Sequence, residues 1–274
     1  MKDKQNKAPK GDAQKKKKKG IKLTPVSTMH YVKLVYRSAL LLGALAFYVI
    51  GKISHDITMY SPFKYSHFFM KVIFVVFVIE MALRFFPSKL ESPGCQKQFR
   101  RNYVKTGNVE IDIQDNNAVM LVALIWIAFN FIFGALYKLK LLDDGIMLLL
   151  SCVYSVCDMI CILFFCPFQS WFMKNKCCSA CRIYNWDYAM MFTPLIFVNN
   201  VYAWILLGMS IVLLARWEIT FYVHPERFAE STNEYLKCAN CTEKLCTHKK
   251  QLQVLWVRTK DFTAERVRRL KKDQ

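Results

Sequence analysis

The stretch MMFTPLIFVNNVYAWILLGMSIVLLARWEITFYV, residues 190–223, decides how this chain is arranged in a membrane. It is longer than the about 20 apolar residues that one membrane-spanning helix needs. Polar residues interrupt it at Asn199–Asn200 and again from Arg216 to Glu218. If the stretch crosses once, the segments before and after it lie on opposite sides. If it turns at Asn199–Asn200 and returns, they lie on the same side.

Four stretches upstream are also long and apolar enough to span a bilayer. They cover Leu34–Ile53, His67–Phe86, Ala118–Tyr137 and Ile146–Pro167. The chain is 54% hydrophobic and yet carries a formal charge of +19. Apolar stretches separated by blocks of charge are typical of multi-span membrane proteins. We therefore predict an all-α integral membrane protein with four to six transmembrane helices.

The sequence divides into three predicted regions. Residues 1–28 form a disordered polybasic tail, whose first twenty residues hold nine lysines against two aspartates and so carry +7. Residues 29–223 form the transmembrane domain. Residues 224–274 form a cysteine-rich segment followed by an amphipathic basic helix over Lys249–Gln274. Within the connection 87–117, the alternation in NVEIDIQDNN predicts a short strand.

Lysine and arginine usage predicts the orientation. The tail and the basic connection 87–117 belong in the cytoplasm, which places the protein in the cell inner membrane with its N-terminus inside. The run Lys15–Lys19 is expected to contact anionic lipids rather than nucleic acid, because the first span begins shortly after it. The 13 Lys and Arg residues from Arg216 onward favour a cytoplasmic C-terminal part. The stretch 190–223 would then turn back and leave both cysteine clusters inside.

Two cysteine clusters flank that stretch. The first is KCCSACRIYNWD, residues 176–187, and the second is KCANCTEKLCTH, residues 237–248. Each contains a C-x2-C pair, which places two thiolates on one tight turn, as a tetrahedral metal requires. The four predicted ligands of one shared site are Cys178, Cys181, Cys238 and Cys241. The spacing suits zinc as well as an iron–sulfur cluster.

Other arrangements of these cysteines stay open. The second cluster can bind metal alone, through three cysteines including Cys246 and the imidazole of His248. Cys177 is a further alternate ligand. The clusters can instead form a redox dithiol centre, because Lys176 and Arg182 favour a thiolate on the first cluster and a neighbouring pair can exchange with it.

Ionisable residues inside the spans are functional candidates. Asp158 lies midway through the fourth predicted span without an evident local partner, and we take it as a proton-handling residue. Glu80 and Arg84 are spaced as an i,i+4 pair, which predicts a local ion pair. Beside the first cluster, Arg182 and Asp187 can pair or orient a bound group.

The blocks CCSACRIYNWDYAMMFTPLIF, HPERF and CANCTEKLC resemble a group of bacterial multi-pass membrane proteins with paired cysteine motifs. The resemblance covers about 80 residues, from Cys177 to Cys246, and implies a bacterial membrane protein without implying an activity. The sequence has no Gly-rich phosphate loop and no H-E-x-x-H motif, so nothing in it resembles a nucleotide-driven pump.

Three functions are therefore predicted. In the first, a cysteine-ligated metal centre at the cytoplasmic face passes electrons between a soluble redox partner and the membrane, with quinone as a possible carrier. The second is a zinc-stapled scaffold without enzyme activity. The third is a small transporter that uses Asp158 and Asn199–Asn200.

Overall fold

The computed structural model describes residues 24–54, 67–107, 116–174 and 177–246, and these residues form helices and connections without a strand. A single β-bridge joins Lys105 to Asn233. The long helices are α1 (Pro25–Ser54), α3 (His67–Arg84), α5 (Asn116–Lys138), α6 (Asp144–Leu163) and α8 (Val201–Val223). The short ones are α4 (Pro93–Gln96), η1 (Arg100–Asn102), η2 (Phe168–Phe172), η3 (Tyr184–Trp186), α7 (Asp187–Phe192), η4 (Thr193–Phe197), η5 (Pro225–Arg227), η6 (Glu234–Leu236) and η7 (Cys238–Asn240).

Four helices, α1, α5, α6 and α8, are long and apolar enough to cross a membrane. Their outward faces carry large apolar side chains, such as Phe131 at 71% exposure and Val201 at 71%. Such surfaces suit lipid and are costly in water. The prediction of an all-α chain is confirmed for the described residues, and the four candidate spans agree with the lower end of the predicted four to six transmembrane helices. The segment predicted as a span over His67–Phe86 forms α3, although it is not among these four helices.

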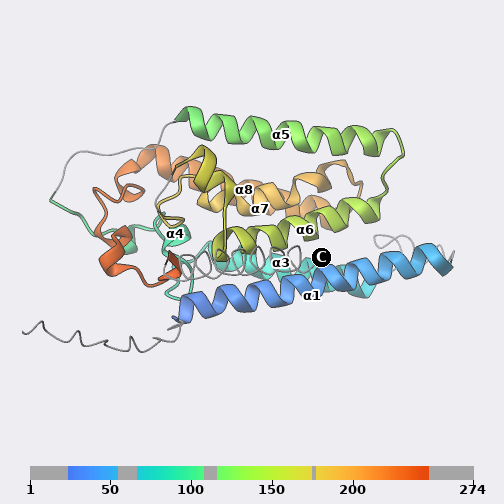
Figure 1. Ribbon diagram of the computed structural model, residues 1–274, viewed down its shortest axis with the longest axis horizontal. Helices are drawn as coiled ribbons and strands as arrows, with labels where there is room; N and C mark the ends of the chain where they lie inside the picture. Colours follow the sequence, from blue (N-terminus) through green and yellow to red (C-terminus); the bar gives the residue numbers. More distant parts are fainter. Residues whose placement is uncertain (1–23, 55–66, 108–115, 175–176, 247–274) are drawn as a thin grey trace, which may run out of the picture.

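The helices form one elongated bundle (Figure 1). Helix α1 packs along α6, and α3 packs along α8. The short arm made of α7 and η4 lies between α6 and α8, and α5 covers η4. Helix α1 begins at Pro25, before the predicted domain boundary at residue 29.

The stretch 190–223 turns back on itself, as its charge pattern predicts. At the turn, the Asn200 side chain accepts a hydrogen bond of 2.9 Å from the backbone amide of Tyr202 and so caps α8. At the open end of the hairpin, the Trp217 indole donates to the backbone oxygen of Arg182 over 2.9 Å. Residues 216–218 do not interrupt the helix. Instead, α8 continues to Val223, because Trp217 is fully buried and Glu218 finds a cationic partner in Arg182.

One end of the bundle, which we name the basic end, is formed by residues 85–107, 164–174, 177–186 and 224–246 together with the start of α1 (Figure 1). These connections are joined to one another. Arg227 donates to the backbone oxygen of Gln98 over 3.2 Å, and the amide of Thr106 donates to the backbone oxygen of Thr232 over 3.1 Å. The hairpin therefore brings the two cysteine clusters to the same end of the molecule.

Several predicted features lie outside the described residues. These are the tail with Lys15–Lys19, most of the predicted strand (residues 108–115), the predicted amphipathic helix Lys249–Gln274, and His248.

Two glycines test the packing of the hairpin. A Cβ at Gly134 of α5 would overlap the ring of Phe197 in η4, whereas a Cβ at Gly208 of α8 meets no atom within 4 Å. We expect Gly134→Ala to lower the free energy of unfolding by about 1–3 kcal/mol. Gly208→Ala, the matched control, should leave it unchanged or raise it by up to about 1 kcal/mol. Thermal unfolding in detergent measures both, and equal effects would contradict the contact between α5 and η4.

Candidate functional site

Both C-x2-C motifs form the tight turns that their spacing predicts. The amide of Cys181 donates to the backbone oxygen of Cys178 over 2.9 Å, and the amide of Cys241 donates to that of Cys238 over 3.4 Å. Cys178 and Cys181 line a cavity, and Cys181 is buried. Cys238 is exposed, and the Cys241 sulfur accepts from the amide of Lys244 over 3.4 Å.

The two clusters make contact through Cys177 and Cys246, which the sequence analysis names as alternate ligands, rather than through the four predicted ligands. The Cys246 thiol points to the sulfur of Cys177, with 3.9 Å between the two sulfur atoms. This hydrogen bond lowers the pKa of Cys177 to about 6 and raises the pKa of Cys246. The pair therefore loses its first proton below neutral pH and its second only far above it.

Glu243 docks the second cluster onto the bundle, a role that the sequence analysis missed. Its carboxylate lies 2.7 Å from His30 Nε2 on α1, and it accepts a hydrogen bond of 2.9 Å from Ser179 in the first cluster. Burial by itself would raise the pKa of Glu243, but the hydrogen bonds from His30 and Ser179 outweigh burial and hold the pKa below its ordinary value. Next to it, Leu245 is buried against α1 and α6.

Lys97 fixes the backbone of the first cluster from a third connection. Its fully buried ammonium donates to the backbone oxygens of Ser179, over 3.0 Å, and Cys181, over 2.9 Å. Burial lowers the pKa of Lys97 to about 7. The nearby thiol of Cys95 is also buried, and burial raises its pKa to about 12 although Arg84 acts to lower it, so we expect this thiol to be unreactive.

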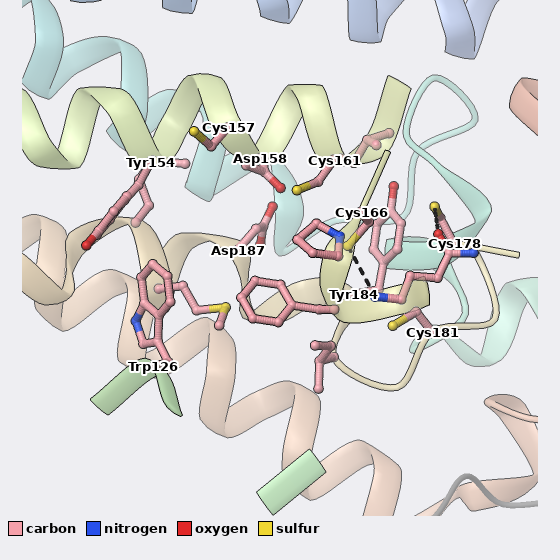
Figure 2. Close-up of a pocket in the computed structure, with 17 residues that line it drawn as sticks. Trp126, Tyr154, Cys157, Asp158, Cys161, Cys166, Cys178, Cys181, Tyr184 and Asp187 are labelled. Carbon is pink, nitrogen blue, oxygen red and sulfur yellow. Dashed lines mark hydrogen bonds between the residues drawn. The ribbon is translucent and has the colours of Figure 1, made fainter. Parts of the chain in front are cut away.

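A cavity of about 290 Å³ lies beneath the first cluster, between α5, α6, η2 and α7 (Figure 2). Five of its lining residues are cysteines: Cys157, Cys161, Cys166, Cys178 and Cys181. The Cys178 thiol donates to Gln169 Oε1 over 2.6 Å, and the backbone amide of Gln169 donates to the Cys166 sulfur over 3.4 Å. Gln169 thus stands between the cluster and the cysteines deeper in the cavity. The wall also carries Asp158 and Asp187.

In the part of the chain that the structure describes, no group of three or more His, Cys, Asp or Glu side chains is arranged to hold a metal ion. The four predicted ligands lie on two turns at one end of the bundle and are not gathered around a common point. The alternative site that uses His248 includes a residue outside the described ranges. Metal binding by these cysteines stays a prediction.

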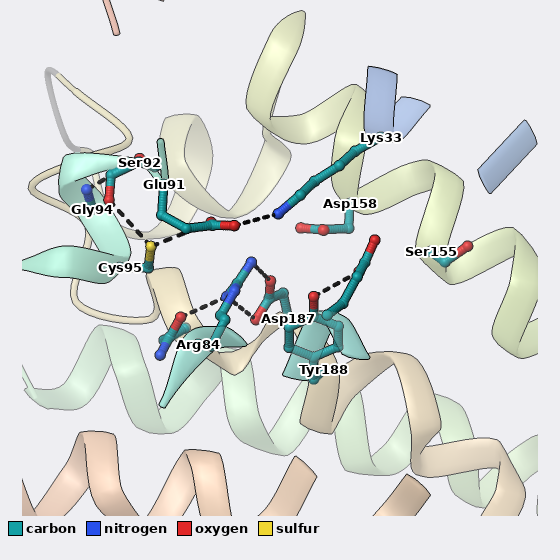
Figure 3. Close-up of polar contacts among 12 residues, drawn as sticks. Lys33, Arg84, Glu91, Ser92, Gly94, Cys95, Ser155, Asp158, Asp187 and Tyr188 are labelled. Atoms are coloured by element: carbon teal, nitrogen blue, oxygen red, sulfur yellow. Dashed lines mark hydrogen bonds and ion pairs between the residues drawn. The ribbon is translucent and has the colours of Figure 1, made fainter. Parts of the chain in front are cut away.

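A network of buried charges crosses the bundle beside the cavity (Figure 3). Arg37 of α1, which is fully buried, donates to Glu80 over 2.6 Å and to Asp158 over 3.0 Å. The Tyr188 hydroxyl donates to the same Glu80 oxygen over 2.6 Å. Asp158 therefore has a partner, which no local pattern reveals because Arg37 is 121 positions away.

The local ion pairs expected from sequence spacing are replaced by pairs between elements. Arg84 binds Asp187 over 2.6 Å rather than Glu80, which is held by Arg37. Arg182 binds Glu218 of α8 rather than Asp187.

No family model, no curated protein and no solved structure matches the chain.

The thiol pair gives a direct prediction. Alkylation of Cys177 by iodoacetamide should reach half of its maximal rate near pH 6. In Cys246→Ala the hydrogen-bond donor is lost, so the pKa of Cys177 should rise toward its ordinary value and the rate at pH 7 should fall roughly 10- to 30-fold. Mass spectrometry of the Cys177 peptide across a pH series measures this. Cys238→Ala, which removes an exposed thiol, serves as the control, and an unchanged profile in Cys246→Ala would contradict the contact.

Proposed function

We propose that this chain is a membrane thiol-redox protein whose reactive pair is Cys177 and Cys246. The observation that carries the proposal is the 3.9 Å approach of these two sulfur atoms from segments on either side of the hairpin. Two thiols at this distance need to move by only about 2 Å to form a disulfide. A thiolate that forms below neutral pH, with a thiol beside it, is the arrangement that thiol exchange requires.

The proposed reaction is an exchange with a soluble thiol protein. The Cys177 thiolate attacks a disulfide of the partner, which forms a mixed disulfide and releases one partner thiolate. Cys246 then loses its proton and attacks the Cys177 sulfur, which closes the Cys177–Cys246 disulfide and releases the second partner thiolate. Two electrons pass to the partner, and the reverse sequence returns them.

We place the basic end in the cytoplasm. Charge supports this orientation: the described connections of that end carry many Lys and Arg residues, while the opposite end carries Lys52, Lys138 and Lys140. The positive-inside rule then puts the N-terminus inside, in the cell inner membrane, with Lys15–Lys19 near anionic lipids. A soluble partner and the reducing cytoplasm both reach the thiol pair from this side.

A metal centre is the second candidate. Cys178, Cys181, Cys238 and Cys241 would supply four thiolates to zinc or to an iron–sulfur cluster. The supporting observation is that both motifs form tight turns at the same end of the bundle. Zinc there would staple the second cluster to the first, whereas an iron–sulfur cluster would carry single electrons.

One experiment separates the two candidates. Full-length protein is purified without oxygen, analysed for zinc, iron and sulfide, and then treated with oxidised glutathione. A Cys177–Cys246 disulfide in mass spectrometry, with no stoichiometric metal, is the expected result. Cys238→Ser should behave like the parent, and Cys177→Ser should lose the disulfide. Stoichiometric metal that disappears in Cys178→Ser and Cys238→Ser would replace the thiol pair with the metal centre.

A further inference from the structure

The cavity beneath the first cluster is lined by aromatic side chains that suit the binding of a flat ring. Trp126 of α5 stands at its edge with the Tyr154 ring 4.7 Å away and the Phe168 ring 6.4 Å away, measured between ring centres. Met190 and Met191 add sulfur-containing side chains, which pack well against aromatic rings. The volume of about 290 Å³ lies at the small end for ligand pockets, so the space suits one ring rather than several.

A second thiol pair lies on the same wall. Cys161 is in the last turn of α6, and Cys166 follows after the helix has ended at Leu163. Both cysteines line the cavity, and their thiols are hydrogen-bonded to each other. Sulfur atoms in hydrogen-bond contact can close into a disulfide after a small rotation of the side chains.

Carboxyl groups complete the wall. The side chains of Asp158 and Asp187 point toward one another at the cavity (Figure 2). Together with Glu80 they face two guanidinium groups, those of Arg37 and Arg84, and the neighbouring Lys33 pairs with Glu91. Four carboxyls against three cations leave one negative charge uncompensated in this cluster. A buried group of that kind is most stable when one carboxyl holds a proton, which the cavity can then exchange.

We propose that the cavity binds the ring of a lipid-soluble quinone and that Cys161 and Cys166 exchange two electrons with it. The two thiols are oxidised to a disulfide, and the quinone becomes a quinol. The two thiol protons balance the two protons that the quinone oxygens take up, and the carboxyl group of Asp158 or Asp187 relays them.

The chemistry of the wall favours a quinone over a lipid chain. Thiols and carboxyls on the wall lose hydrogen bonds when a hydrocarbon covers them, but they can donate to the two oxygens of a quinone. This inference rests on the proposed thiol-redox function and deepens it, because it names the partner on the membrane side. The Cys177–Cys246 pair would face the soluble partner, and Gln169 lies between the cavity pair and Cys178.

A single-turnover measurement tests the inference. The full chain in lipid nanodiscs is reduced, freed of reductant without oxygen, and mixed with an equimolar amount of decylubiquinone. Loss of the quinone absorbance and a Cys161–Cys166 disulfide in mass spectrometry are expected. Cys161→Ser and Cys166→Ser should abolish the Cys161–Cys166 disulfide and the reduction that depends on it, while Trp204→Leu, which changes an exposed side chain on the outer face of α8, should match the parent. When the decylubiquinone concentration is varied, Trp126→Leu should raise the half-saturating concentration roughly 5-fold through lost ring contact.

The outcomes separate this inference from the proposed function. Quinone that stays oxidised with the parent protein, while Cys177 and Cys246 still form a disulfide with oxidised glutathione, overturns the inference alone. Equal quinone reduction in the parent, Cys161→Ser and Cys166→Ser also overturns it. Quinone reduction by a protein that forms no Cys177–Cys246 disulfide with oxidised glutathione supports the cavity site and sinks the soluble exchange.

Discussion

Replacement of Trp217 by alanine should lower the free energy of unfolding by about 3–5 kcal/mol, the range for removal of a large buried aromatic side chain. Trp217 is fully buried near the end of α8, packs edge-on against Phe228 with 4.8 Å between ring centres, and lies 5.3 Å from the Lys97 ammonium. Its indole also donates to the backbone oxygen of Arg182. The side chain therefore fastens the returning helix to the first cysteine cluster.

The same change should impair the thiol pair. Without Trp217 the first cluster loses its attachment to α8, so oxidant-induced formation of the Cys177–Cys246 disulfide should slow by about 10-fold, as expected when reacting groups lose their fixed orientation. Trp204 provides a matched control on the same helix, because its side chain is 50% exposed on the outer face. Trp204→Ala should keep both the stability and the rate of disulfide formation close to those of the parent. A similar loss in both variants would show that the bundle as a whole, rather than this contact, was disturbed.

Replacement of Arg37 by methionine should be equally damaging. The change leaves Glu80 and Asp158 in the bundle without the guanidinium that binds both, and loss of one partner of a buried ion pair typically costs about 3–5 kcal/mol. Thermal unfolding in detergent and the monodisperse fraction on gel filtration measure the loss.

Two further variants give this prediction its specificity. Arg216→Met removes a half-exposed cation whose guanidinium donates to the backbone oxygen of Phe85, and it should cost no more than about 1 kcal/mol. Adding Glu80→Gln to Arg37→Met should restore part of the lost stability, because it removes one of the uncompensated charges. No recovery in the double variant would mean that packing around Arg37, rather than charge, supports the bundle.

Hydropathy and charge predict much of this architecture from the sequence. The helical spans follow from stretches long enough to cross a bilayer, and the turn at Asn199–Asn200 follows from two polar residues within an apolar run. The positive charge after Arg216 also indicates correctly that the chain returns. These features depend on local composition, which the sequence displays directly.

Partners of the buried charges could not be predicted in the same way. Spacing along one helix joins Glu80 to Arg84, whereas the structure joins Glu80 to Arg37 on another helix. Similarly, the C-x2-C spacing of the cysteines predicts two tight turns, but it does not show which thiol of one cluster contacts which thiol of the other. Cys177 and Cys246 are brought together by Glu243 and Leu245, two residues that carry no motif and act through contacts with α1 and α6.

The hydrogen bond between His30 and Glu243 joins residues 213 positions apart, so it has a consequence for biosynthesis. A growing chain inserts its first helix long before Glu243 has been translated. Until then His30 has no carboxylate from the C-terminal segment, and Cys246 has not yet been made. Cys177 therefore passes through a period without Cys246 and open to oxidants or metals, which ends only when the segment around Cys246 has left the ribosome. The thiol pair can therefore form only after the second cluster has been translated.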